Sequence, residues 1–391
     1  MKKQVSPVVA VLAVVLAFGA VMGVYWKGLL GDKGGDGEPM GGGGGGMPPP
    51  PLVGMPTVTV TTLSGPAPNS LTEAEGGLQD GPAREARFDG PSAVAVDAAG
   101  VVYVTDGRSH RIRAISPDGA VRTVAGSGPV GSVLGGLSDG PAATARFWGP
   151  SGLAAGADGS LLIVDTGNHR VRRLSADTVT TVAGSNTAPD RLGLPDGGFA
   201  DGPGAAAQFR YPTGTCALPD GSCLIADTGN RRLRKVAPDG TTSTVADLAP
   251  AGAQSPCGVA RYPDGRVLVV DPAAEALFVV TADGAVSQLS GIDTGAPIWS
   301  QPTGLAIGAD STVYVADTGS HCIMRIPPGG PPQLLAGVVD VQYPSPGFSD
   351  GTGSASQFTA PSGIAIGPQG ELYVADFGNN CVRKIVIAPG T

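Results

Sequence analysis

Short apolar segments alternate with polar, glycine-containing turns along most of this chain, and the segments recur as near-identical units. Each unit has an apolar run that ends in Asp and a turn that follows it, as in Val164–Arg170 and Ala226–Arg232. The steps between successive repeated Asp residues are 59, 62, 44, 46 and 59 residues. The six residues are Asp106, Asp165, Asp227, Asp271, Asp317 and Asp376. Strand-like repeats of about 40–50 residues are typical of propeller blades, so the pattern predicts a ring of equivalent β-units.

The unit at residues 150–183 shows the expected blade in full. Its apolar runs predict strands over 150–155, 161–164, 171–174 and 178–183. Asp-Gly pairs recur in the turns between such runs, where hairpins require positive φ. Four antiparallel strands make one propeller blade.

The two ends of the repeat region are complementary. The last unit stops at residues 383–387 and lacks a fourth strand, whereas residues 58–65 match the fourth strands at 121–126 and 179–184. The segment at 58–63 is therefore predicted to complete blade six and close the ring, which leaves no long exposed sheet edge.

These motifs resemble the NHL-repeat family of six-bladed propellers over about residues 57–388. The resemblance rests on the Pro-x-Gly strand start, the Tyr-Val-Ala-Asp strand end and the phrase Asn168–Arg172. Blade four departs from the pattern, with Pro272–Glu275 in place of the Thr-Gly-Asn turn. The resemblance implies an all-β fold that binds protein or RNA through one face. A few related propellers are metal-dependent hydrolases or lyases, which implies an alternative.

Residues 1–27 and 28–56 differ in composition from the propeller at 57–391. Val8–Trp26 is an uncharged run of 19 residues, and a helix of that length spans about 28 Å, close to a hydrocarbon core of about 30 Å. The run favours a transmembrane signal anchor; a cleaved signal peptide is the alternative. Residues 28–56, rich in Gly and Pro, are expected to be a disordered linker.

The lysines at the extreme N-terminus favour a periplasmic or extracellular propeller, with secretion after cleavage as the alternative. The predicted contact with the membrane is through the N-terminal helix only. The net charge of −8 disfavours a nucleic-acid partner, which needs a basic surface; RNA binding stays a second rival. The expected ring is monomeric.

Five Cys without a CxxC pair and three His make a structural zinc site unexpected, and no cofactor or metal is predicted. Cys216 and Cys223 flank one hairpin, so a cross-strand disulfide stays open. His110, His169 and His321 share one register, four residues after the repeated Asp. Blades two and five face each other at roughly 20 Å or more, since strands lie about 4.8 Å apart, so the three His cannot share one metal.

The repeated Asp residues obey the symmetry of the ring and are interpreted as structural, accepting hydrogen bonds from the turns that follow them. Symmetry is broken by an insert, Asp-Gly-x4-Ala/Ser-x-Phe, before the first strand of blades one, two, three and six. We expect each insert to form a helical turn and its Phe to pack between blades. We also expect the inserts to form a raised crescent on one face of the ring, over blades six, one, two and three, and this face to be lower over blades four and five. The crescent either plugs the mouth of the ring or contacts a ligand.

Basic and aromatic residues are predicted to gather on the same face over blades one to three. An arginine-rich surface favours an acidic partner; the alternative is a rim of arginines that contact only solvent. The aromatic residues either stack on a ligand or pack inside the protein. The candidate ligand-binding residues are Arg84, Arg87, Arg108, His110, Arg146, Trp148, His169, Arg210, Tyr211 and Arg231. No catalytic residues are predicted.

The sequence therefore predicts a membrane-tethered NHL-repeat propeller that acts as a non-catalytic binding or scaffold module. Its expected partner is a protein or an extended polymer, held on the loop-rich face. The alternative is a hydrolase or lyase, similar to the amidating lyases, with a metal-dependent site in the mouth.

Overall fold

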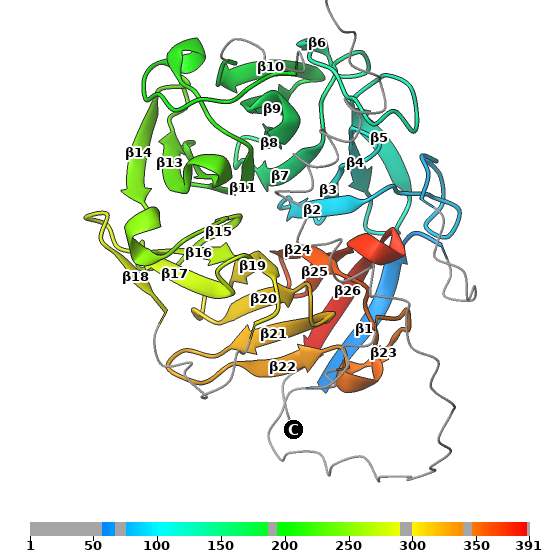
Figure 1. Cartoon of the computed structure of the whole chain (residues 1–391). Coiled ribbons are helices and arrows are strands. Elements are labelled where there is room, and N and C mark those ends of the chain that lie inside the picture. Colours follow the sequence, from blue (N-terminus) through cyan, green and yellow to red (C-terminus); the bar gives the residue numbers. More distant parts are fainter. Residues whose placement is uncertain (1–56, 67–75, 187–193, 290–298, 339–345, 389–391) are drawn as a thin grey trace, which may run out of the picture.

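The computed structural model of the chain describes residues 57–66, 76–186, 194–289, 299–338 and 346–388. Within these ranges the strands form six antiparallel sheets, which stand as blades around one axis (Figure 1). The six-bladed all-β propeller predicted from the repeats is confirmed. The apolar run at residues 8–26 lies outside the described ranges, and inside them no helix is long and apolar enough to cross a membrane.

Each blade has four strands, ordered from the axis outward. Blade one holds β2 Pro91–Val96, β3 Val102–Asp106, β4 Arg111–Ile115 and β5 Val121–Ala125. Blade two holds β7 Pro150–Ala155, β8 Leu161–Asp165, β9 Arg170–Ser175 and β10 Thr178–Ala183. Blade three holds β11 Pro212–Ala217, β12 Cys223–Asp227, β13 Arg232–Val236 and β14 Thr242–Asp247.

The other three blades follow the same plan. Blade four holds β15 Gly258–Arg261, β16 Val267–Asp271, β17 Ala276–Val280 and β18 Val286–Gln288. Blade five holds β19 Pro302–Ile307, β20 Val313–Asp317, β21 Cys322–Ile326 and β22 Gln333–Ala336. Blade six holds β24 Pro361–Ile366, β25 Leu372–Asp376, β26 Cys381–Ala388 and the N-terminal β1 Thr57–Ser64.

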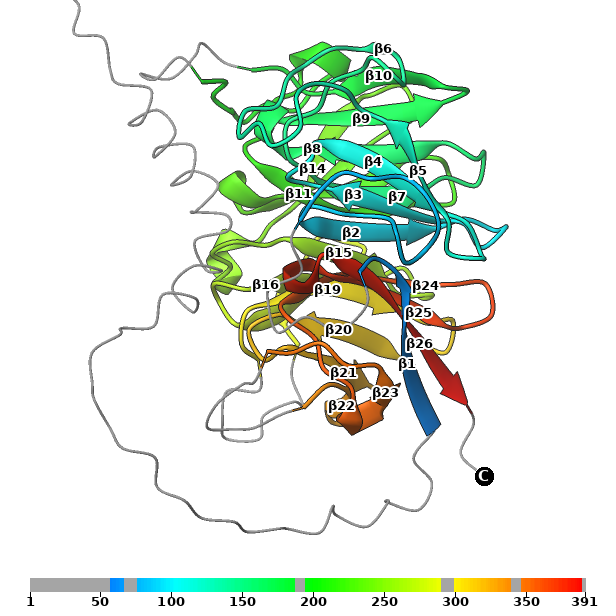
Figure 2. The same cartoon turned by 90° about the vertical axis from the view of Figure 1, so that its right-hand side faces the viewer.

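The strand β1 closes the ring, as predicted. It pairs antiparallel with β26 from Thr57 opposite Ala388 to Ser64 opposite Val382. Val60 is fully buried in this pairing. Figure 2 shows the start of β1 and the end of β26 at the face opposite to the short helical turns that follow the second strands. The first and last described segments thus hold each other in one sheet.

The hub of the ring is made by close contact between neighbouring inner strands. A Cβ added to Gly152, Gly214 or Gly304 would collide with a carbonyl oxygen of the next blade, so only glycine fits there. One side chain in or directly before each inner strand also donates to a carbonyl of the next blade, and together these bonds form a closed belt. The donors are Ser92, Ser151, Thr213, the thiol of Cys257, Thr303 and Ser362, at 3.0–3.5 Å.

Apolar side chains fill the space between blades. Alternation along each strand sends side chains to both faces of a blade, so one cluster joins Ile112 of blade one to Ile163 of blade two. The insert phenylalanines Phe88, Phe147, Phe209 and Phe358 are fully buried in such clusters. The prediction that they lie between blades is confirmed.

The inserts take a different path from the predicted one. Residues Gly140–Pro141 (β6) pair with β10, and Gly351–Thr352 (β23) pair with β1, each as a fifth strand at the outer edge. Gly81 and Gly202 bridge to β5 and β14 in the same way. The Asp-Gly part of each insert therefore covers the rim of a blade instead of rising over the mouth, because its backbone pairs with the edge strand.

The predicted helical turn inside the inserts is present. The amide of Ala86 donates to the carbonyl of Pro82 at 3.0 Å, and that of Ala145 donates to Pro141 at 2.9 Å. Blades three and six have the 3-10 turns η2 Gly204–Ala206 and η5 Gly353–Ala355 at this place.

A buried arginine on the third strand ties each insert to its blade. Arg172 donates to Asp165 of β8 at 2.7 Å and to Asp139 of the insert at 2.6 Å. It also donates to the carbonyls of Arg146 and Ser138, the two residues that bridge across the insert. The four equivalent side chains, all completely buried, are Arg113, Arg172, Arg234 and Arg383.

Aromatic rings cover these guanidinium groups. Arg234 lies between Phe199 and Phe209, at 4.9 and 5.0 Å from the ring centres. Arg383 lies between Phe348 and Phe358 in the same way. Blades four and five, which lack the insert, have Phe278 and Met324 in place of the arginine. The arginine and the insert thus occur together.

The open question of a Cys216–Cys223 disulfide is settled by register. Cys216 stands opposite Leu224, and Cys223 stands opposite Ala217. Side chains one step apart on paired strands point to opposite faces, and the two cysteines belong to different interblade clusters. Both are free thiols.

Replacing Arg172 by Met, the residue that blade five has at this position, tests the clamp. We expect a loss of about 3–5 kcal/mol in the free energy of unfolding, because two carboxylates and two carbonyls lose their shared donor. Urea or thermal denaturation measures it. The matched control is Arg266→Met, whose exposed ion pair with Asp264 should contribute less than about 1 kcal/mol. Equal losses in the two variants would contradict the clamp.

Candidate binding site at the mouth of the ring

The turn after the second strand of each blade builds the mouth of the ring. In blades two, three and six it forms the 3-10 turns η1 Thr166–Asn168, η3 Thr228–Asn230 and η6 Phe377–Asn379. The repeated Asp before each turn is completely or almost completely buried. The amide of Trp148 donates to Asp165 at 2.8 Å, and that of Arg210 donates to Asp227 at 2.8 Å. The Asp thus fixes the segment that enters the inner strand of its own blade.

This geometry extends the predicted role of the Asp residues. Four of them accept from the turn that follows, as expected: Asp271 from the amides of Ala273 and Ala274, and three others from an Asn side chain of the turn. All six also accept from a residue 17 positions earlier, a contact that the repeat alone does not reveal. Their structural character is as expected.

Burial dominates the charge state of these carboxyls. It raises the pKa of Asp106 to about 7 and that of Asp165 to about 6, while the neighbouring arginine opposes the rise. Asp317 has no arginine beside it, and burial raises its pKa to about 7, helped by the charge of Glu275. Glu275 therefore lies near Asp317, at the boundary between blades four and five.

The residue four positions after each repeated Asp forms what we call the junction cap. All six have left-handed backbone, with φ of 48–58°. At four junctions the cap accepts an N–H from the next blade: His110 from Gly149, His169 from Tyr211, His321 from Ala360 and Asn380 from Gly90, at 2.9–3.0 Å. At the other two junctions the cap is Arg231 or Glu275.

The capping histidines are buried structural groups. His169 is fully buried, with Nδ1 accepting from Tyr211 and Nε2 facing the carbonyl of Pro195 at 3.3 Å. His110 is arranged alike, with Nε2 at 3.0 Å from the carbonyl of Ser132. Burial lowers the pKa of His169 to about 4 and lowers that of His110 as well. Both were candidate ligand residues, and in this structure their ring atoms connect blades.

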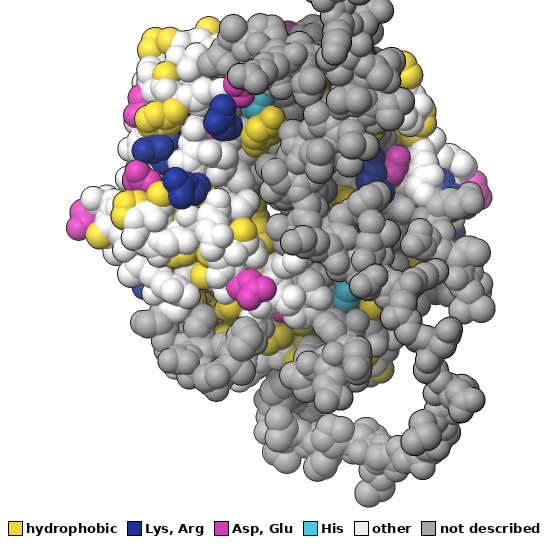
Figure 3. Space-filling model, viewed as in Figure 1, with side chains coloured by type: hydrophobic (Ala, Val, Ile, Leu, Met, Phe, Trp, Pro, Cys, Tyr) yellow, Lys and Arg dark blue, Asp and Glu magenta, His cyan; other side chains and the backbone are white. Residues whose placement is uncertain are grey.

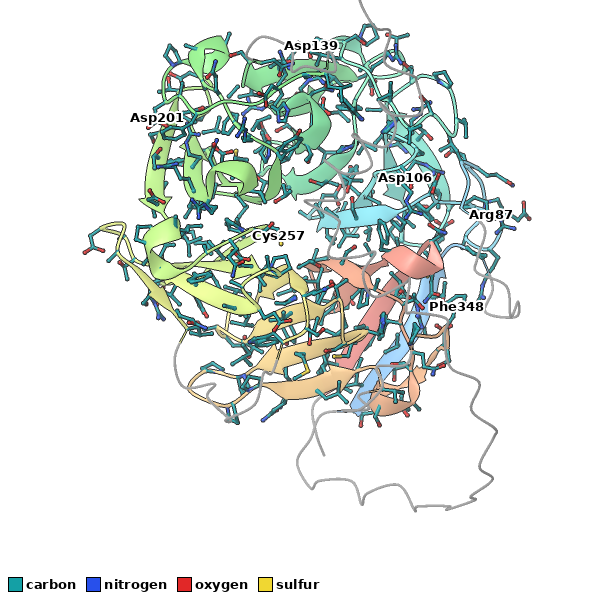
Figure 4. The ribbon with its side chains drawn as sticks, viewed as in Figure 1. Arg87, Asp106, Asp139, Asp201, Cys257 and Phe348 are labelled. Carbon is teal, nitrogen blue, oxygen red and sulfur yellow. The ribbon has the colours of Figure 1, made fainter. Side chains whose placement is uncertain are left out.

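The predicted arginines divide into two groups. Arg108, Arg210 and Arg231 are exposed at the mouth, and Figure 3 shows basic groups there, over blade three. Arg84 is exposed in the insert turn beside the rim. Figure 4 places Arg87 at the outer edge of the ring, as it does Asp139 and Asp201 of the inserts.

The other candidates are half-buried or buried. Arg146 is half-buried against Gly128 and Gly136 of its own connection. Trp148 is 8% exposed and packs under Gly167. Tyr211 is half-buried, with φ of 44° and its ring edge-on to His169 at 4.5 Å between centres. The mouth thus brings together Arg210, Tyr211 and Arg231 and leaves the insert arginines apart.

Sequence reasoning missed two features. The buried arginines could have been found from the sequence, because the four blades with an insert all have an Arg seven residues after the repeated Asp. The junction caps carry another, since His or Asn stands in four of six equivalent positions and Arg231 and Glu275 break the pattern.

A His169→Asn variant tests the cap chemistry, because Asn380 performs the same role in blade six. A neutral ring is required in the fold, so His169 contributes stability that is complete above about pH 6.5 and is lost as the pH falls toward about 4. Relative to the variant, the wild type should therefore lose up to about 1.4 kcal/mol per pH unit across that window. Denaturation at several pH values measures the difference; a difference that is independent of pH would refute the neutral cap.

Comparison with known proteins agrees with this geometry. Residues 88–115, 147–174 and 358–385, in blades one, two and six, match the family model of the NHL repeat. Protein SUPPRESSOR OF QUENCHING 1, chloroplastic, of Arabidopsis thaliana is 31% identical over 140 residues, 34% of this chain and 12% of that protein. NHL repeat-containing protein 2 of Bos taurus is 30% identical over 172 residues, 41% of this chain and 22% of that protein. The matches span less than a quarter of these relatives.

Solved structures show the same fold at low identity. A protein of unknown function from Bacteroides thetaiotaomicron has a TM-score of 0.63 at 17% identity, over 85% of this chain and 76% of that one. An auxiliary nutrient binding protein from Bacteroides ovatus has a TM-score of 0.61 at 16% identity, over 85% and 77%. A streptogramin B lyase has a TM-score of 0.52 at 15% identity, over 85% and 98%. The chain is a six-bladed β-propeller that carries NHL repeats.

Proposed function

We propose that the chain is a non-catalytic binding module that holds an extended acidic partner, a protein or another polymer, across the mouth face. The observation that supports it is a set of three exposed arginines at the mouth. Arg108 is 58% exposed at its side chain and lies 3.9 Å from Asp89. Arg210 is 45% exposed and pairs with Asp196 at 3.2 Å. Exposed ion pairs contribute little, so an acidic ligand can compete for these guanidinium groups.

Arg231 is the third arginine of the set. It is exposed, and within the described ranges its side chain makes no ion pair. Its neighbour Arg232 pairs with Asp247 at 3.0 Å and lies over Phe199. A basic surface attracts and orients an acidic partner at a distance.

The fold does not by itself choose between binding and catalysis, since similar propellers include a nutrient binding protein and a lyase. Among the residues that the structure describes, no three His, Cys, Asp or Glu side chains gather where they could hold a metal ion. The hydrolase or lyase alternative therefore has no described site to support it, and the exposed arginines favour binding.

Binding of fluorescent polyglutamate to the purified full chain tests the proposal. The double variant Arg210→Glu/Arg231→Glu should weaken binding by about tenfold or more, since a tenfold change is about 1.4 kcal/mol, and salt should weaken wild-type binding. The matched control is Arg266→Glu, an exposed arginine in a first hairpin turn, on the opposite face. Equal affinity in the double variant and the control would reject the mouth as the contact surface.

We further propose that residues 8–26 tether the propeller to a membrane, with the propeller on the periplasmic or extracellular side. The uncharged run of 19 residues supports this. Val15→Arg should release the full chain from the membrane fraction, because a central Arg costs about 2.5–3.5 kcal/mol on insertion. The control is Gly43→Arg in the linker. A mature N-terminus beyond residue 17 in the purified protein would instead identify a cleaved signal peptide.

A further inference from the structure

Two adjacent blade junctions lack the capping bond that the other four have. At the junctions capped by His or Asn, the side chain accepts the N–H of the residue that precedes the inner-strand proline of the next blade. Between blades four and five that residue is Gln301, with φ of 57°. Within the described ranges the N–H of Gln301 has no hydrogen-bond partner, and the cap position holds Glu275.

The caps at these two junctions keep the left-handed backbone of the turn but, in the part of the chain that the structure describes, make no side-chain hydrogen bond to the next blade. Arg231 and Glu275 have φ of 52° and 48°, a left-handed region that costs about 1–2 kcal/mol for ordinary residues. Asn is enriched in this region, and in blade six the side chain of Asn380 accepts the N–H of Gly90 from the next blade. Arg231 and Glu275 have long, exposed side chains instead. Residues held in such sparsely populated backbone conformations are concentrated at functional sites.

Charge at these junctions differs in sign. Figure 3 shows basic groups over blade three and an acidic group over the boundary of blades four and five, on the same face. Both junctions lie where the inserts are absent, since the connections into blades four and five have no Asp-Gly insert. A uniformly acidic polymer meets attraction at Arg231 and repulsion at Glu275, whereas a polypeptide of mixed charge satisfies both.

We propose that Arg231, Glu275 and the N–H of Gln301 form a contact sector for a polypeptide with both acidic and basic side chains. Arg231 pairs with an acidic side chain, Glu275 pairs with a basic one, and the Gln301 amide donates to a main-chain carbonyl. This inference rests on the proposed function and narrows its ligand from any acidic polymer to a protein segment.

The variant Glu275→Asn separates a binding role from a structural one. Asn suits left-handed backbone and can cap the N–H of Gln301 as Asn380 caps that of Gly90. We therefore expect the melting temperature to rise, because a strained residue is replaced and an amide gains a partner. The matched control is His321→Asn, which exchanges one cap for another and should leave the contact sector unchanged.

The binding measurement uses a displayed library of random peptides, selected on the purified full chain. Enriched peptides should combine Asp or Glu with Lys or Arg, and Glu275→Asn should weaken them at least tenfold while His321→Asn changes affinity less than threefold. Three results would overturn the inference: no enrichment, enrichment of purely acidic peptides, or unchanged affinity in a more stable Glu275→Asn variant. Polyglutamate binding that still depends on Arg210 and Arg231 would then show that the proposed function stands without it.

Discussion

The architecture of four blades depends on the hydrogen bonds and ion pairs of the buried arginine on the third strand. Its guanidinium group joins a carboxylate at the end of the second strand, a carboxylate of the insert and two insert carbonyls. A buried cation needs several acceptors to offset its desolvation, and Arg172 finds them only when the insert is folded against the blade. Insert, arginine and both carboxylates therefore form one unit, and blades four and five lack the arginine together with the insert.

A second constraint acts at the axis, where all six blades must meet. Inner strands approach so closely that a Cβ at Gly214 or Gly304 would overlap the next blade, and the belt of hydroxyl and thiol donors fixes their height relative to one another. The belt repeats in all six blades, and the glycine is present in five of them, with Ala93 at the equivalent position of blade one. The mouth is less constrained, because a junction cap contributes only one of the many hydrogen bonds that join neighbouring blades. The capping residue can therefore be replaced without separating the inner strands at the hub.

Much of this was accessible from the sequence because it repeats locally. Strand positions such as 178–183, the closing role of residues 58–63 and the burial of Phe147 follow from period and apolar spacing. The path of the inserts did not follow, because the pairing of Gly140 with Val179 links segments 39 residues apart. The cysteines were ambiguous for a related reason: a register shift of one residue decides whether Cys216 and Cys223 face each other.

The structure separates the candidate site residues into exposed and buried ones, which the sequence could not do. Composition located basic residues near the mouth but could not tell Arg210, which is exposed, from Arg146, which is half-buried against glycines. Symmetry is the better guide, since residue types that connect blades recur at equivalent positions of most blades. His169 and Asn380 obey the rule and connect blades, whereas Arg231 and Glu275 keep the strained backbone of a cap without its bond. Natural proteins retain such a local cost where a side chain serves a partner, and on this ground the two uncapped junctions are proposed as the contact sector.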